Sequence, residues 1–180
     1  AVQHITRLLG PPQLQALEKE YRAEVLLGRE TDTLDITGKT VLEAPVPHLS
    51  ESKIKKILQC FSGKIMQVPP RFSAKHHQGE RFYQLARKNI EFKIEPQEVE
   101  VKTIDLISYG KTGLIINTVV KRGVYIRSLA RDIGHALGSV GILKALVRTR
   151  VGNFTVEEAL PFVQIAPGFD PVSSRSFRRL

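Results

Sequence analysis

The sequence predicts an α+β fold in which a mixed, mostly antiparallel sheet is flanked by helices. Segments with a strand pattern outnumber segments with a helix pattern, and the connections between them are mostly short. Two apolar segments, Val99–Tyr109 and Leu114–Lys121, are separated only by a turn between two glycines. Such a pair is typical of an antiparallel hairpin, which places at least part of the sheet in the antiparallel class.

In chain order, the first strand is expected over Glu20–Leu27, where apolar and charged side chains alternate and Tyr21 lies at the entrance. The segment Gly28–Gly38 is rich in Thr and Asp, which bond to their own backbone, and is expected to be a polar loop. A calcium loop is the weaker interpretation, because its oxygen spacing is absent. Further strands are expected over Lys39–Glu43 and Ile90–Ile94, and Gly141–Leu146 forms another apolar segment.

Helices are expected at four places. Ser50 is a candidate N-cap for a helix whose apolar stripe begins at Ile54 and which should stop at Gly63. A short helix is expected over Phe82–Arg87, and a capping box formed by Thr155 and Glu158 should open a last one. The longest helix follows Gly123, because the apolar residues Ile126, Leu129, Ala130, Ile133 and Leu137 recur at helical spacing.

The junction at Gly123 is the first candidate site, because an apolar strand, a glycine and an amphipathic helix meet there. If the backbone is still extended, Tyr125 and Arg127 project from the same face. Sites are often built at such turns. The alternative is structural: Tyr125 covers the core and Arg127 is a solvated helix residue.

Composition narrows the class of protein. The 180 residues suffice for one core, and we expect one domain over residues 1–165 and a basic, flexible tail over 166–180. A net charge of +9 favours a polyanionic partner such as RNA or DNA, although it also fits a merely basic protein. The single cysteine, Cys60, excludes an internal disulfide and suits the cytoplasm. No apolar run reaches the roughly 20 residues of a membrane span.

The segment from Gln67 to Arg81 combines two prolines, an aromatic residue and many cations, which is plausible for an RNA-contacting loop. Adjacent histidines diverge and no carboxylate or cysteine completes a site, so we expect no metal. The RNA-contact candidates here are Arg71, Lys75, His76 and Arg81, and Arg148 is a further one.

Several short motifs, taken in order, resemble the TruB family of tRNA pseudouridine synthases. One motif alone is weak, but seven in register from Thr6 to about Leu160 make the resemblance specific. The motifs are Thr6-Arg7-Leu8; Lys19-Glu20-Tyr21 with Gly28; Thr31-Asp32-Thr33-Leu34-Asp35-Ile36-Thr37-Gly38; Gln67-Val68-Pro69-Pro70 with Ser73-Ala74; Gly79 to Arg87; Gly123-Val124-Tyr125-Ile126-Arg127-Ser128-Leu129; and Arg148-Thr149 with Gly152-Asn153-Phe154.

The resemblance implies a pseudouridine synthase-like catalytic domain that isomerises a uridine in the T-loop of tRNA, conventionally position 55, without a cofactor. The base is flipped out, its glycosidic bond breaks, and C5 is joined to the sugar. By motif, Tyr21 would stack on the flipped base, Tyr125 would line the pocket and Leu146 would close it. Arg127 would pair with the catalytic aspartate. The implied partner is tRNA, with no membrane and no obligatory protein partner.

One departure from the family concerns the nucleophile. The family's catalytic aspartate lies in a Gly-Thr-Leu-Asp-Pro segment upstream of the Thr6 motif, and that segment is absent here. Asp35 carries the letters Thr-Leu-Asp, but it follows Tyr21 and belongs to a different family motif, so we do not expect it to be the nucleophile. We therefore expect an N-terminally incomplete domain that is inactive alone. The alternative is a non-catalytic tRNA-binding protein derived from this fold.

Overall fold

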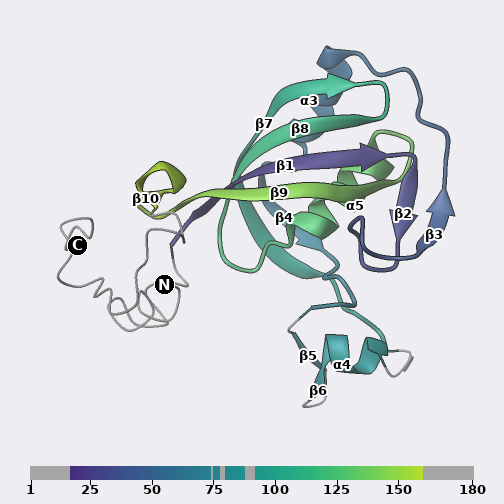
Figure 1. Cartoon of the computed structure of the whole chain (residues 1–180), viewed down its shortest axis with the longest axis vertical. Coiled ribbons are helices and arrows are strands. Elements are labelled where there is room, and N and C mark those ends of the chain that lie inside the picture. The colour runs from purple at the N-terminus through teal and green to yellow at the C-terminus, as the bar shows by residue number, and fades with distance from the viewer. Residues whose placement is uncertain (1–16, 74, 78–79, 88–91, 160–180) are drawn as a thin grey trace, which may run out of the picture.

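A computed structural model describes residues 17–73, 75–77, 80–87 and 92–159 of the chain. Its centre is a six-stranded sheet with the order β10-β9-β1-β8-β7-β4, in which all neighbouring strands are antiparallel (Figure 1). The predicted α+β class, with a largely antiparallel sheet, is confirmed. The six strands are β1 (Lys19–Leu27), β4 (Gly63–Gln67), β7 (Gln97–Gly110), β8 (Gly113–Val120), β9 (Gly141–Val151) and β10 (Phe154–Thr155).

Smaller elements extend from this sheet. Two short antiparallel pairs, β2 with β3 and β5 with β6, lie beside and below it in Figure 1. No helix in the described ranges is long and apolar enough to cross a membrane. The remaining elements are β2 (Arg29–Thr31), β3 (Thr40–Glu43), β5 (His76–His77), β6 (Glu80–Arg81), α3 (Glu51–Gln59), α4 (Phe82–Arg87), α5 (Ile126–Ala136) and the 3₁₀ turn η1 (Val156–Glu158).

The core lies between the sheet and the helices α3 and α5, which pack on the same face of it (Figure 1). From β1, Ala23 and Val25 are fully buried, and from α5, Leu129 and Ile133 are fully buried. The alternation that predicted β1 therefore arises because every second residue enters this core. Burial of these side chains fixes the position of α5, whose first turn carries Arg127.

Most of the predicted elements form close to the expected residues. Ser50 caps α3, since its hydroxyl accepts a hydrogen bond from the Lys53 backbone N–H at 3.3 Å. The helix ends earlier than predicted, at Gln59 with Cys60 as its C-cap, and Gly63 instead opens β4 with a φ of 93°. The capping box of Thr155 and Glu158 is confirmed, and it opens η1.

Other expectations were wrong. Residues 92–94 of the predicted strand Ile90–Ile94 have no regular structure, and its first two residues lie outside the described part. The expected loop Gly28–Gly38 contains β2, and β4 was not predicted. Both strands are short, and β4 is an edge strand with an exposed Met66, so pairing with a neighbour outweighs their weak local pattern. The predicted tail over 166–180 lies outside the described residues.

Two glycines bring α5 into close contact with the start of β9. A side chain at Gly134 would place its Cβ 2.6 Å from the carbonyl carbon of Val140 and 2.7 Å from the Cα of Gly141. At Gly141, a Cβ would lie 2.8 Å from the Ala130 carbonyl oxygen. Backbone atoms cannot rotate away as a flexible side chain can, so this crossing requires glycine.

We predict that Gly134→Ala lowers the free energy of unfolding by about 1–3 kcal/mol, because the added methyl group pushes α5 away from β9. Urea denaturation followed by circular dichroism measures the change. The matched control is Gly110→Ala, where a Cβ would meet no atom within 4 Å; its effect should stay within about 0.5 kcal/mol. Equal losses in both variants would contradict the close-contact argument.

Candidate active site

The backbone leading into α5 differs from the expectation in one respect. Gly123 adopts a φ of 98°, and Tyr125 is still extended with φ −100° and ψ 113°. The helix begins at the next residue, Ile126. Arg127 therefore lies in the first helical turn, so the extended backbone that would place Tyr125 and Arg127 on one face does not continue past Tyr125. What positions Arg127 is the packing of α5.

Arg127 connects α5 to two loops. Its Nη1 donates to the backbone oxygen of Thr33 at 2.9 Å and to Oδ2 of Asp35 at 3.3 Å, and its Nη2 donates to the backbone oxygen of Phe72 at 2.7 Å. The side chain is 25% exposed. A solvated helix arginine does not make three such contacts, so Arg127 is not the solvated residue that the structural alternative assumed.

Asp35 is held as firmly as the arginine it meets. Its Oδ1 accepts hydrogen bonds from the Thr33 hydroxyl at 2.8 Å, the Thr37 hydroxyl at 2.6 Å and the Thr37 backbone N–H at 3.0 Å. Burial alone raises the pKa of Asp35, but these donors and the positive charge of Arg127 outweigh it, so the pKa lies below its ordinary value of 3.8. The carboxylate is ionised at neutral pH.

The loop that carries Asp35 is fixed to the sheet at its other side. The Leu143 N–H donates to the Leu34 carbonyl at 3.0 Å, and a parallel bridge joins Asp35 to Leu143 of β9. Leu34 adopts a φ of 62°, a conformation that side chains rarely take. The hairpin of this loop also contacts α5 a second time, where His135 Nε2 lies 2.7 Å from Glu30 Oε2. Loop, helix and sheet thus form one connected unit.

The strand register collects three of the predicted residues on one face of the sheet. Tyr21 lies opposite Arg148, and Ala23, two residues further along β1, lies opposite Leu146. Because directly opposed residues share a face, Tyr21, Leu146 and Arg148 all lie on the face that Ala23 buries in the core. Leu146 remains 43% exposed and Tyr21 is half-buried against the core cluster. An apolar and an aromatic surface are therefore available on this face.

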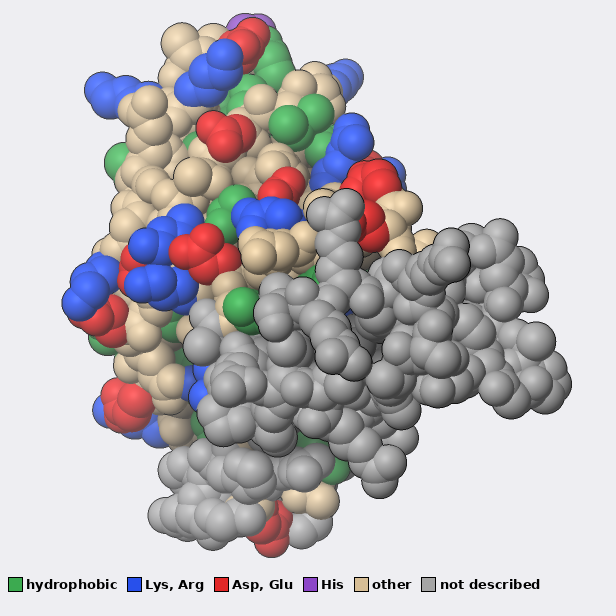
Figure 2. Space-filling model, turned by 90° about the vertical axis from the view of Figure 1, so that its left-hand side faces the viewer, with side chains coloured by type: hydrophobic (Ala, Val, Ile, Leu, Met, Phe, Trp, Pro, Cys, Tyr) green, Lys and Arg blue, Asp and Glu red, His purple; other side chains and the backbone are tan. Residues whose placement is uncertain are grey.

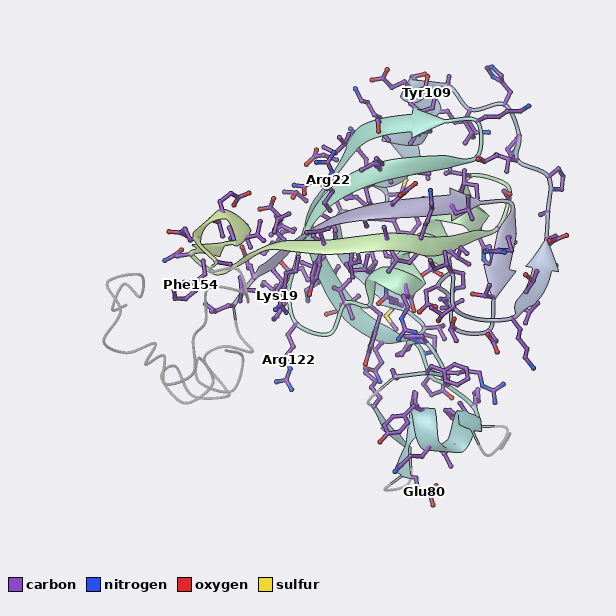
Figure 3. All side chains as sticks on the ribbon, viewed as in Figure 1. Lys19, Arg22, Glu80, Tyr109, Arg122 and Phe154 are labelled. Carbon is purple, nitrogen blue, oxygen red and sulfur yellow. The ribbon has the colours of Figure 1, made fainter. Side chains whose placement is uncertain are left out.

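Cations surround the end of β1 next to Tyr21. Figure 3 shows Lys19 and Arg122 extending from the same end of the sheet. Burial lowers the pKa of Lys19, and the positive charges of Arg148 and Arg122 lower it further. Neither Lys19 nor Arg122 was selected from the sequence, although Lys19 stands two residues from Tyr21. On the surface seen in Figure 2, by contrast, Lys and Arg side chains are interspersed with Asp and Glu.

The predicted RNA-contact loop forms a separate small unit around α4, below the sheet in Figure 1. The guanidinium of Arg71 lies 5.5 Å from the ring centre of Phe92, which in turn lies 4.9 Å from that of Phe82. Lys75 is half-buried, and burial lowers its pKa. The backbones of His76 and Arg81 pair between β5 and β6, but their side chains lie outside the described part. Nowhere in the described ranges do three His, Cys, Asp or Glu side chains gather around a possible metal ion.

Two residues of the site were missed from the sequence. Asp35 was set aside because its motif lacks the nucleophile's context, yet it is the carboxylate that Arg127 contacts. Gln67 was quoted only as part of a motif, yet it is buried and bonds to the backbone of Tyr125 at both ends of its side-chain amide. The cluster of threonines around Asp35 was the available signal, since hydroxyls flanking a carboxylate indicate that it is held in its ionised form.

Comparison with solved structures finds chains that share the fold of this protein. A crystal structure of a Cbf5-Nop10-Gar1 complex matches with a TM-score of 0.60 over 85% of this chain and 36% of that chain, at 24% identity. A structure of an H/ACA RNP bound to a substrate RNA containing 2'-deoxyuridine matches with a TM-score of 0.55 over 84% of this chain and 34% of that chain, at 22% identity. At these identities the likeness concerns the fold.

Sequence comparison then identifies the family. The N-terminal domain of the TruB family pseudouridylate synthases matches residues 1–126. A tRNA pseudouridine synthase B of Gloeobacter violaceus is 40% identical over 173 residues, which are 94% of this chain and 58% of the relative. One from Caldanaerobacter subterraneus is 39% identical over 84% of this chain and 53% of the relative. The chain belongs to the TruB pseudouridylate synthase family and spans about half the length of these relatives.

We predict that Asp35 contributes stability that depends on pH. Because its pKa in the folded state lies below 3.8, the contribution is present above that value and is lost as pH falls through the folded pKa. Between about pH 5 and pH 2 the wild type should therefore lose more stability than Asp35→Asn. Thermal unfolding at a series of pH values measures the difference.

Thr37→Val provides the graded comparison, because it removes one hydroxyl donor to Asp35 and leaves the Thr37 backbone donor in place. Its pH dependence should lie between those of the wild type and Asp35→Asn. If all three proteins lose stability in parallel as pH falls, the contacts of Asp35 do not stabilise its ionised form.

Proposed function

We propose that this chain supplies the uridine-binding half of a tRNA pseudouridine synthase site, which isomerises uridine 55 in the T-loop without a cofactor. The observation that carries the proposal is the Arg127–Asp35 pair, held at the start of α5 and attached to β9, the strand of Leu146. It is supported by the family and by relatives named tRNA pseudouridine synthase B.

The side chains of the shared face suit a base that has left the RNA stack. Tyr21 offers an aromatic ring for stacking, and Leu146 an exposed apolar side chain to cover the base. To Tyr125, the half-buried N-cap residue of α5, we assign the lining of the pocket. Flipping a base costs a few kcal/mol of unstacking, which stacking on an aromatic ring partly offsets. Arg148 and Lys19, next to Tyr21, suit the phosphates on either side of the base.

Asp35 is poorly placed to attack the substrate itself. Its Oδ1 already accepts three hydrogen bonds, and its Oδ2 faces Arg127. A nucleophilic carboxylate needs a free oxygen, so we assign the attack to the aspartate of the family's Gly-Thr-Leu-Asp-Pro segment. Among the described contacts of Arg127, Nε–H and one Nη2–H remain available, and a planar fork of this kind binds a second carboxylate.

We predict that the 180-residue chain alone forms no pseudouridine when incubated with unmodified T-stem-loop RNA. Fusing to its N-terminus the family's Gly-Thr-Leu-Asp-Pro segment should restore turnover, because it brings in the attacking carboxylate. Mapping of pseudouridine in the RNA measures both. Product from the chain alone would show that Asp35, or another carboxylate of this chain, performs the attack.

The matched control in this fusion compares two arginines. Arg127→Lys keeps the charge but cannot make the three contacts, so the single-turnover rate should fall by a factor on the order of 100, while RNA affinity changes little. Arg22→Lys, an exposed position of β1, should leave both unchanged. A fusion that binds the RNA but never modifies it would instead favour the non-catalytic tRNA-binding protein.

We predict that binding of the chain to T-stem-loop RNA weakens steeply with salt, because its net charge is +9. Each neutralised phosphate contributes roughly 0.7 to 0.9 to the slope of log affinity against log salt. Arg148→Gln should reduce the slope by about that amount. The matched control is Lys55→Gln on α3, since Lys55 already pairs with Glu51 at 2.7 Å. A flat slope for the wild type would count against RNA as the partner.

A further inference from the structure

Gln67 is the largest polar side chain among the buried residues of the described part, with 1% of its surface exposed. It is the last residue of β4, and its amide bonds to Tyr125, which lies 58 positions further along the chain. Gln67 Oε1 accepts from the Tyr125 backbone N–H at 2.8 Å, and Gln67 Nε2 donates to the Tyr125 carbonyl oxygen at 3.2 Å. Both ends of the side chain are thus used on one residue.

The bonded residue is the one from which α5 starts. Tyr125 is the N-cap of α5, and its own side chain makes no capping hydrogen bond. Its carbonyl oxygen also accepts the first hydrogen bond of the helix, from the Leu129 N–H at 3.0 Å. A buried amide that bonds the backbone on both sides of Tyr125 therefore adds a local restraint where α5 begins, beyond the core packing that holds the helix as a whole.

Neighbouring residues add further hydrogen bonds between the start of α5 and the segment that follows β4. The Ser128 hydroxyl donates to the carbonyl oxygen of Val68 at 2.8 Å, and Arg131 Nη2 donates to the same oxygen at 3.2 Å. Arg127 Nη2 reaches Phe72, a little further along the segment that follows β4. The first turns of α5 and the segment 67–72 are thus joined at several points, and Gln67 is the point nearest to Tyr125.

We propose that Gln67 is a positioning residue of the active site. By restraining the backbone N–H and C=O of Tyr125, it orients the Tyr125 ring and, through the first turn of α5, the Arg127 guanidinium. The proposal rests on the proposed function for its kinetic consequence. An apolar residue would fill this buried position without the desolvation cost of an amide. The Gln67 amide instead bonds to both peptide groups that flank Tyr125, so it satisfies the Tyr125 N–H and also restrains the orientation of the two peptides.

The test compares three variants in the fusion that carries the Gly-Thr-Leu-Asp-Pro segment. Gln67→Met keeps the length and removes both hydrogen bonds, so the single-turnover rate should fall about tenfold or more, with RNA affinity nearly unchanged. Ser139→Ala is the control, because it removes a buried hydroxyl's 3.4 Å hydrogen bond to the Ala44 carbonyl oxygen near the other end of α5. It should leave the bound-state rate unchanged.

Gln67→Glu separates positioning from simple packing. An ionised carboxylate accepts from the Tyr125 N–H but presents no donor to the Tyr125 carbonyl, whereas the protonated carboxyl group both donates and accepts, as the amide does. Burial favours the protonated form. The rate deficit of Gln67→Glu relative to the wild type should therefore shrink as pH falls from about 8 to about 5. The deficit of Gln67→Met should stay constant, because methionine does not titrate.

A second measurement does not depend on turnover. In the 180-residue chain, hydrogen exchange followed by NMR should show that the Tyr125 amide exchanges faster in Gln67→Met, while the Leu129 amide keeps its protection. If the wild-type fusion is inactive, the proposed function fails. The exchange measurement then shows by itself whether Gln67 restrains the Tyr125 backbone. Wild-type rates in Gln67→Met, or unchanged exchange at Tyr125, would overturn the positioning role.

Discussion

The site depends on one guanidinium, which extends from the core-packed helix α5 and bonds to two loops. Arg127 contacts Thr33 and Asp35 in one loop and Phe72 in another, and α5 beneath it is anchored by fully buried residues such as Leu129. Two of its three acceptors are backbone carbonyls, which hold the side chain in place without neutralising its charge. A lysine carries its three donors on one nitrogen, whereas the acceptors of Arg127 are reached from two nitrogens at separate positions, Nη1 and Nη2. Positioning and charge are thus supplied by the same side chain.

The second constraint is a register shift between β1 and β9. Tyr21 lies opposite Arg148 but Glu20 lies opposite Arg150, so Thr149 is an extra residue in β9. Without this bulge, the two arginines would lie on the same face of the strand. With it, Arg150 bonds to Glu20, its Nε lying 3.0 Å from Oε2, while Arg148 stays on the face of Tyr21. One inserted residue thus places Arg150 in a bond with Glu20 and leaves Arg148 on the other face, where we propose that it contacts RNA.

The sequence was sufficient to predict those elements in which the spacing of apolar residues follows the spacing of buried positions. Strand β1 and helix α5 were predicted because their alternate or helically spaced residues enter the core. It was insufficient for the short strands β2 and β4, which owe their conformation to pairing, β2 with β3 in a local hairpin and β4 with the distant strand β7. The Asp35–Arg127 contact joins residues 92 positions apart, and no local pattern encodes such a distance. Gln67 was missed for the same reason, since a buried amide has no spacing signal of its own.

The charges of the site explain why Asp35 needs so many donors. Asp35 and Arg127 neutralise each other, so a second carboxylate beside the same guanidinium would give the group a net negative charge. Like charges raise each other's pKa, and one of the two carboxylates would then tend to take up a proton. Hydrogen bonds from Thr33 and Thr37 lower the pKa of Asp35 and stabilise its negative charge independently of Arg127. Because its charge is stabilised in this way, Asp35 would remain ionised if Arg127 also paired with the attacking carboxylate that we propose.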